Sequence, residues 1–258
     1  MKAKKSLGQN FLIDNNIIDK IVDNINAKEN DLIIEIGPGK GALTNKLKIK
    51  KSYIICYELD IDLKEYLDKI EDYKTKIIYQ DILNANIKED IKNVKYNNLY
   101  IVGNLPYYIT TPIIKYIIDM KLEVKEMIFM VQDEVADRFT ALPKSKEYGS
   151  ITLYLKYYFN VKKLFKVNKN SFNPVPKVES AIIKFSNRLD KPNASEKQYF
   201  KLINDSFKMK RKTLKNNLSN YDFNKIKKVL NKYNLNESVR AEELSEEIFI
   251  DILNEINN

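Results

Sequence analysis

The chain has 258 residues, which is enough for one large domain or for one domain with a small appendage, and its formal charge is +9 at pH 7. Because it contains no histidine, catalytic triads with an imidazole base and histidine-bound zinc sites are excluded, and the single cysteine, Cys56, excludes an internal disulfide and a cysteine metal cluster. No apolar run of about 18 residues predicts a membrane span, and no secretory signal is visible. We therefore expect a metal-free cytoplasmic protein. Its charge fits a polyanionic partner, although AT-rich coding also enriches Lys, Asn and Ile.

The first 13 residues form a basic arm that contains Lys4 and Lys5. Gln9 and Asn10 follow, in the position where polar residues commonly cap a helix. Apolar residues at helical spacing then predict a helix over residues 17–25.

Residues 31–37 form a short apolar segment that predicts a strand, and its end overlaps the pattern Glu35-x-Gly37-x-Gly39-x-Gly41. Alternating glycines let the backbone pass close to a ligand and present amides at a helix N-terminus. The spacing differs from the G-x-G-x-x-G pattern of dinucleotide-binding proteins. A second predicted strand, residues 53–58, ends in Glu58, where a carboxylate can bind both hydroxyls of a ribose.

A third predicted strand, residues 76–82, again carries a carboxylate at its end, Asp81, and a fourth leads into Asn104-Leu105-Pro106-Tyr107. Because Pro106 fixes its own φ and restricts the residue before it, this loop is stiff. Its amide, its carbonyls and its aromatic ring suit a planar base that bears an amino group, although such a tetrapeptide alone also fits an ordinary strand-to-helix turn. Strands that alternate with helices and end in polar edges predict a doubly wound parallel α/β sheet.

Three further strands are expected at residues 125–132, 161–167 and 181–185, with a helix over 148–159. The loop 171–180 contains two prolines that hold Phe172 near Lys177, so Phe172 is either a core residue or a stacking residue. A polar linker at 187–195 divides the expected domains, 1–186 and the wholly helical 187–258. The second domain carries a basic run at 208–215, which is either a solvated helix face or a set of phosphate contacts.

Taken together, these segments resemble the ribosomal RNA adenine N6-dimethyltransferases, the KsgA family. Six motifs in the expected order carry the resemblance, and they span nearly the whole chain: Leu7-Gly-Gln-Asn-Phe-Leu12, Glu35-Ile-Gly-Pro-Gly-Lys-Gly-Ala-Leu-Thr44, Tyr57-Glu-Leu-Asp60, Gln80-Asp-Ile-Leu83, Gly103-Asn-Leu-Pro-Tyr107 and Phe172-Asn-Pro-Val-Pro-Lys-Val-Glu-Ser180. The resemblance implies a Rossmann-like, seven-stranded class I methyltransferase sheet that binds S-adenosylmethionine, with a small C-terminal helical domain.

The resemblance also implies roles for individual residues. Asn104 would contact both cofactor and target amine, a carbonyl of Leu105 or Pro106 would accept a second hydrogen bond, and Tyr107 and Phe172 would stack on the base. The residues implied to bind cofactor are Gln9, Asn10, Leu12, Gly37, Gly39, Glu58, Leu59, Asp81, Ile82 and Asn104. The residues implied to bind RNA are Lys4, Lys5, Lys177, Lys208, Lys210, Arg211 and Lys212.

The activity implied is dimethylation of two adjacent adenines in a hairpin near the 3′ end of small-subunit ribosomal RNA, with a role in maturation of that subunit. Because the sequence shows no obvious dimer seam, we expect a monomer. The related large-subunit enzymes of macrolide resistance are the nearest alternative, and Leu105 favours the small-subunit group. A non-catalytic ribosome-assembly factor is a second alternative, although every expected contact residue is intact. The glycine spacing argues against a dehydrogenase, and the basic tail argues against a small-molecule methyltransferase.

Overall fold

The computed structural model describes Lys4, residues 7–192 and residues 194–258, and for Tyr107 it describes the backbone alone. The chain folds into two compact units. The first comprises the described residues up to Ala136 together with Lys162–Asn187, and the second comprises Asp137–Val161 and Arg188–Asn258. The expected domain boundary after residue 186 lies one residue from the point, after Asn187, where the chain passes from the first unit to the second. Residues 137–161, however, were expected in the first domain and fall in the second unit.

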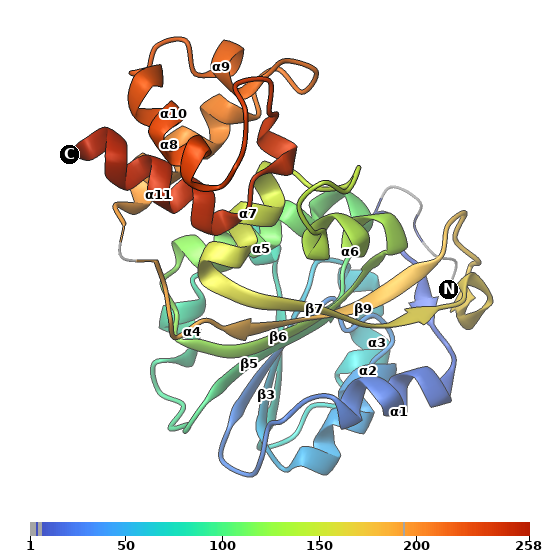
Figure 1. The fold of residues 1–258 in the computed structure, drawn as a ribbon. Coiled ribbons are helices and arrows are strands. Elements are labelled where there is room, and N and C mark those ends of the chain that lie inside the picture. Colours follow the sequence, from blue (N-terminus) through green and yellow to red (C-terminus); the bar gives the residue numbers. More distant parts are fainter. Residues whose placement is uncertain (1–3, 5–6, 193) are drawn as a thin grey trace. The chain divides into compact units, whose positions relative to one another are not determined.

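The first unit is built on a seven-stranded sheet with the order β4-β3-β2-β5-β6-β9-β7 (Figure 1). Its strands are β2 (Leu32–Ile36), β3 (Tyr53–Glu58), β4 (Thr75–Tyr79), β5 (Leu99–Asn104), β6 (Val124–Gln132), β7 (Phe159–Val167) and β9 (Ser180–Asn187). The four neighbouring pairs from β4 to β6 are parallel, as expected.

The parallel sheet expected from the first four strands does not extend to β9, which pairs antiparallel with β6. Parallel neighbours need a crossover connection, usually a helix. No such crossover helix precedes β9, because residues 168–179, which connect β7 to β9, contain no α-helix. The sheet is therefore mixed, and it matches the seven-stranded methyltransferase sheet that the resemblance implied.

Helices cover both faces of this sheet (Figure 1). On one side lie α1 (Asn15–Asp23), α2 (Ala42–Leu47) and α3 (Lys64–Leu67), and on the other lie α4 (Ile87–Ile91) and α5 (Thr110–Asp119). Because side chains alternate across a strand, every second strand residue joins one core. The core with α1 to α3 includes Ile33, Cys56, Val102, Ile128 and Ile182. Burial on both faces explains why these strands are almost continuously apolar.

A separate two-stranded sheet joins β1 (Phe11–Leu12) to β8 (Phe172–Asn173). Leu12 pairs with Phe172 in this antiparallel sheet. Short 3₁₀ turns connect several elements of the chain, namely η2 (Lys48–Lys50), η3 (Ile61–Leu63), η4 (Ile82–Asn84), η5 (Tyr107–Ile109), η6 (Lys169–Ser171) and η7 (Ala241–Glu243). The β1–β8 pairing brings the start of the chain against the proline-rich loop.

The second unit is helical around its own apolar core. It contains α7 (Ser150–Tyr158), α8 (Glu196–Ser206), α9 (Leu214–Asn217), α10 (Phe223–Lys232) and α11 (Glu246–Asn257), and α6 (Asp133–Thr140) enters it from the first unit. Tyr157 of α7 stacks on Tyr199 of α8 with ring centroids 5.3 Å apart. This apolar face of α7 explains why residues 137–161 belong to the second unit.

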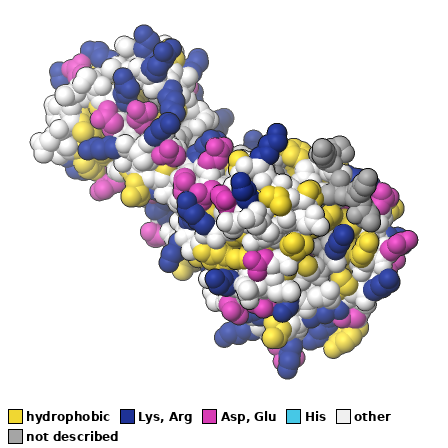
Figure 2. Space-filling model, turned by 90° about the vertical axis from the view of Figure 1, so that its right-hand side faces the viewer, with side chains coloured by type: hydrophobic (Ala, Val, Ile, Leu, Met, Phe, Trp, Pro, Cys, Tyr) yellow, Lys and Arg dark blue, Asp and Glu magenta, His cyan; other side chains and the backbone are white. Residues whose placement is uncertain are grey.

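On the face shown in Figure 2, Lys and Arg side chains are interspersed with Asp and Glu over both units. No helix among the described residues is long and apolar enough to cross a lipid bilayer.

Candidate active site

A cavity of about 100 Å³ opens at the carboxyl ends of β2, β3, β4 and β5 in the first unit. Eleven residues expected to bind cofactor or target base line it together: Gln9, Asn10, Gly37, Gly39, Glu58, Leu59, Asp81, Ile82, Asn104, Leu105 and Pro106. This edge of a parallel sheet is where α/β proteins bind ligands. The sequence motifs therefore converge on one site, as the resemblance implied.

The glycine-rich loop after β2 forms one wall of this cavity. Gly39 has a φ of +59°, and a β-carbon there would lie 3.0 Å from the ring of Phe11, so any larger residue is strained and crowded. The amide of Gly37 donates to the carbonyl of Tyr57 at 2.9 Å, which ties the loop to β3. The backbone can therefore approach a ligand closely.

Glu58 lies at the end of β3 and is 6% exposed. Its Oε2 accepts a hydrogen bond from the amide of Gly39 at 3.1 Å, and its Oε1 accepts one from the amide of Asp60 at 2.8 Å. Burial raises the pKa of Glu58, although the backbone hydrogen bonds partly oppose that shift. The carboxylate is thereby held rigidly at the cavity wall, where its remaining lone pairs can accept from vicinal hydroxyls.

Asp81 and Ile82 form the wall beyond β4. The Asp81 side chain caps η4 by accepting from the amide of Leu83 at 3.0 Å, and Ile82 is buried. A fixed carboxylate beside a buried apolar side chain suits a purine, whose exocyclic amine donates and whose ring is apolar.

β5 ends in Asn104, whose Nδ2 donates to the carbonyl of Asn10 at 2.9 Å. This bond uses the amide nitrogen, so Oδ1 is the acceptor that the side chain can offer to an amine. Leu105 is buried, and the carbonyl of Pro106 closes the next turn by accepting from the amide of Ile109 at 3.1 Å. The side chain of Tyr107 lies outside the described atoms, so its stacking role stays a prediction.

A second cavity, of about 260 Å³, lies against α1, α2 and the sheet and shares Gly37, Gly39 and Asn104 with the first. Leu12 lines this second cavity rather than the first. So does Glu35, which is 1% exposed and which accepts a long hydrogen bond of 3.7 Å from the thiol of Cys56. Burial raises the pKa of Glu35 to about 7.

Phe172 does not lie where a stacking residue would. It is 2% exposed, belongs to the apolar core with Leu12, and lines neither cavity. The pairing of β8 with β1 accounts for this burial. Of the two alternatives that the sequence left open for Phe172, a core residue or a stacking residue, the structure therefore shows a core residue.

The residues expected to bind RNA have different surroundings. Lys4 lies within 2.5 Å of carboxylate oxygens of Asp60 and Asp62, and Lys5 lies outside the described residues. Lys177 is exposed. The basic run 208–215 occupies the turns between α8 and α9 as far as residue 213, and its last two residues begin α9. Its five basic residues are all exposed: Lys208, Lys210, Arg211, Lys212 and Lys215.

Sequence reasoning missed three residues at the site. Glu35 begins the glycine motif, but no role was assigned to it, and Tyr108, which is 62% exposed, lines the first cavity. Asp60 follows Glu58 by two residues and is buried. Asp60 closes the motif Tyr57-Glu-Leu-Asp60, but nothing in that motif indicates its contacts with Lys4 and Gln9. Across the described residues, no group of three or more His, Cys, Asp or Glu could hold a metal ion.

The mixed seven-stranded sheet, the glycine-rich loop and the buried carboxylate of Glu58 at the end of β3 define a class I methyltransferase that uses S-adenosylmethionine. The sequence matches the ribosomal RNA adenine dimethylase family over residues 1–258, and the chain belongs to that family. This confirms the resemblance drawn from the six motifs.

Relatives and solved structures agree with this assignment. The chain is 40% identical over 255 residues to ribosomal RNA small subunit methyltransferase A of Clostridium botulinum. This match covers 96% of this chain and 92% of that protein. The chain is 41% identical over 254 residues to the protein of the same name from Streptococcus pneumoniae, with coverages of 94% and 88%. Among solved structures, a dimethyladenosine transferase from Plasmodium falciparum has a TM-score of 0.81 at 25% identity, with coverages of 96% and 97%. The 23S rRNA methyltransferase ErmE has a TM-score of 0.75 at 22% identity, with coverages of 96% and 100%, and thus shares the fold.

Proposed function

We propose that the chain dimethylates the exocyclic amines of two adjacent adenines in a hairpin near the 3′ end of small-subunit ribosomal RNA, and that it serves maturation of that subunit as a monomer. The small-subunit substrate is supported by the relatives from Clostridium botulinum and Streptococcus pneumoniae, which are named as small-subunit methyltransferases. The choice of adenines follows from the motif resemblance.

One observation carries the assignment of the site. The strand order β4-β3-β2-β5 places Asp81, Glu58, Gly37 and Asn104 in that sequence along the edge of the sheet. Neighbouring strands lie about 4.8 Å apart, so these four positions extend over roughly 14 Å. The order corresponds to adenine, ribose, methionine and target amine, which is the order of the parts in a complex of S-adenosylmethionine with its acceptor.

The proposed chemistry needs no histidine base. Bound S-adenosylmethionine supplies a methyl group on an electrophilic sulfonium. The lone pair of an adenine amine is delocalised into the ring, and hydrogen bonds from its N–H groups to Asn104 Oδ1 and to a carbonyl of Leu105 or Pro106 favour a pyramidal, more nucleophilic nitrogen. This nitrogen forms the new N–C bond as the C–S bond breaks, with the electron pair going to sulfur, and the amine proton leaves to solvent. Positioning by the loop is the main contribution of the protein.

The target adenine must leave its stack to enter the site, and an aromatic ring would hold it there. Tyr107 fills this role in the proposal. Phe172, which belongs to β8 and is buried in the apolar core with Leu12, would support the site from the core. Lys177 and the exposed basic run of the second unit would contact RNA phosphates.

The test is methyl transfer from labelled S-adenosylmethionine to small subunits that lack the modification, with large-subunit RNA in parallel and the modified bases mapped. Dimethyladenine at adjacent small-subunit positions is the expected result. Label in large-subunit RNA would assign the chain to the macrolide-resistance type, and cofactor binding without transfer to either RNA would indicate a non-catalytic assembly factor.

Asn104→Ala should abolish transfer and largely spare cofactor binding, whereas Asn97→Ala, at an exposed position of the same unit, should transfer methyl groups like the wild type. Equal loss of transfer and of cofactor binding in Asn104→Ala would contradict the role given to its oxygen.

A further inference from the structure

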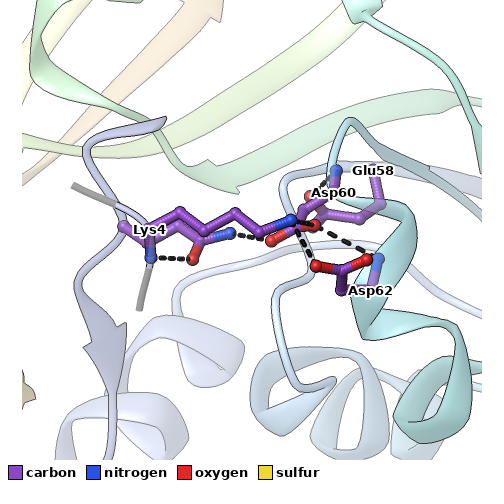
Figure 3. A network of polar contacts seen from close by, with 5 residues as sticks. Lys4, Glu58, Asp60 and Asp62 are labelled. Carbon is purple, nitrogen blue, oxygen red and sulfur yellow. Dashed lines mark hydrogen bonds and ion pairs between the residues drawn. The ribbon is translucent and has the colours of Figure 1, made fainter. Parts of the chain in front are cut away.

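A network of partly buried polar contacts connects Lys4 and Gln9 to the cavity wall, and the activity described above does not account for it (Figure 3). The arm, defined here as Lys4 together with residues 7–12, approaches the end of β3 at Asp60. Figure 3 shows the Lys4 side chain extended toward both Asp60 and Asp62, with Glu58 beside Asp60.

Asp60 is the centre of this network. Its side chain is 1% exposed, and both of its carboxylate oxygens are engaged. Oδ1 accepts from the Lys4 ammonium at 2.5 Å and from the amide of Asp62 at 3.2 Å, and Oδ2 accepts from Gln9 Nε2 at 2.6 Å. Gln9 in turn accepts from the backbone amide of Lys4 at 2.8 Å. A buried carboxylate is stable only with such partners, so the arm and Asp60 depend on each other.

The balance of these contacts favours the ionised form of Asp60. Burial alone raises its pKa, but the hydrogen bonds from Lys4 and Gln9 outweigh burial, so that the net pKa lies below its usual range. The carboxylate is therefore charged at neutral pH, and charged hydrogen bonds are the stronger kind.

The arm held in this way is itself part of the cavity. Residues 7–11 all line it, together with Glu58 and Leu59. At its far end the arm is fixed by the bond from Asn104 to the carbonyl of Asn10 and by the β1–β8 pair. Toward the start of the chain, Lys4 and Gln9 both contact Asp60, and Lys4 also pairs with the exposed carboxylate of Asp62.

Asp60 also connects the arm to the residues that would bind ribose. Its backbone amide donates to Glu58 Oε1, while Glu58 Oε2 accepts from the glycine-rich loop at Gly39. The arm, the ribose carboxylate and the glycine loop thus share one chain of hydrogen bonds.

We propose that Asp60 is a positioning residue that latches the arm over the cofactor cavity, so that the cofactor and its demethylated product leave only when the Asp60 contacts to Lys4 and Gln9 open. This rests on the proposed binding of S-adenosylmethionine in that cavity. Dimethylation of one adenine uses two cofactors in succession, and the product of the first must leave before the second enters. The latch therefore sets the rate of exchange between the two transfers.

The test measures the dissociation rate of S-adenosylhomocysteine by stopped-flow displacement in the full chain. Removing the charge of a buried, charge-assisted contact should accelerate dissociation about tenfold in Asp60→Asn. Lys4→Met, which changes a partly exposed side chain, should give an effect of the same direction. Asp62→Asn is the matched control, because Asp62 also contacts Lys4 but is 59% exposed, and it should change the rate by less than about twofold.

The double variant Lys4→Met/Asp60→Asn separates a latch from a merely structural role. If the two residues act through one contact, its dissociation rate should be close to that of Asp60→Asn alone, and not the product of the two single effects. Unchanged dissociation in Asp60→Asn, independent effects in the double variant, or an equal effect in Asp62→Asn would each overturn the latch. Failure of the wild type to bind the ligand at all would overturn the proposed function and the latch with it.

Discussion

The buried carboxyl group of Glu35 should make the stability of the protein depend on pH. Its pKa is about 7 in the folded chain, whereas the ordinary value is 4.5. Between these values the folded state holds a proton that the unfolded state has released, so the free energy of unfolding falls as the pH rises from 4.5 to 7. At ~1.4 kcal/mol for each pKa unit, a shift of about 2.5 units corresponds to a loss of about 3 kcal/mol across this window.

Glu35→Gln keeps the shape of the side chain and removes its titration. We measure urea unfolding of wild type and variant by circular dichroism, without cofactor, at several values between pH 4.5 and 8. The free energy of unfolding of the variant, relative to that of the wild type, should rise by about 3 kcal/mol from the acid to the alkaline end. Glu65→Gln, at an exposed position, is the control and should follow the wild type. Parallel curves for Glu35→Gln and wild type would refute the reasoning.

Three further outcomes follow from the geometry. Gly103→Ala should destabilise the chain by about 1–3 kcal/mol in urea unfolding, since its new methyl would lie 2.6 Å from the carbonyl oxygen of Ile36, whereas Gly149→Ala meets nothing within 4 Å and should be nearly neutral. Glu58→Ala should weaken S-adenosylmethionine binding about tenfold or more in calorimetry, because two or more hydrogen bonds to a charged acceptor are lost, and unchanged affinity would exclude the ribose contact. The third change neutralises four residues of the basic run together: Lys208, Lys210, Arg211 and Lys212. The slope of log K for small-subunit binding against log salt concentration should become shallower by about one unit for each residue that contacts phosphate. An unaltered slope would show that the run is a solvated turn.

Much of the first unit could be predicted from its sequence, because local signals there agree with the fold. The strand predicted at residues 53–58 is observed as β3 (Tyr53–Glu58), since its apolar run ends at a charged residue. The strand that leads to Asn104 was likewise found from its apolar run and the glycine before the loop. The residues with ligand chemistry lie at such strand ends, and for that reason most of the residues expected to bind cofactor line one cavity.

What could not be predicted depends on contacts between distant segments. Phe172 is buried because β8 pairs with β1, which lies 160 residues earlier in the chain. Asp60 is buried because Lys4 and Gln9 reach it from the arm. The placement of residues 137–161 in the second unit depends on aromatic packing of Tyr157 against helices that follow much later. None of these pairings leaves a local pattern in the sequence.

The arrangement of the site depends on topology more than on any motif. Along the chain the four proposed ligand positions occur as Gly37, Glu58, Asp81 and Asn104, whereas along the sheet edge they occur as Asp81, Glu58, Gly37 and Asn104. The reversal arises because the chain builds outward from β2 to β3 and β4 and then returns to place β5 on the other side of β2. The loops after β2 and β5 therefore run to opposite sides, which opens a crevice at this switch point. In the proposed complex the methyl donor and the acceptor amine meet in that crevice, because Gly37 and Asn104 follow adjacent parallel strands with Ile36 paired to Gly103.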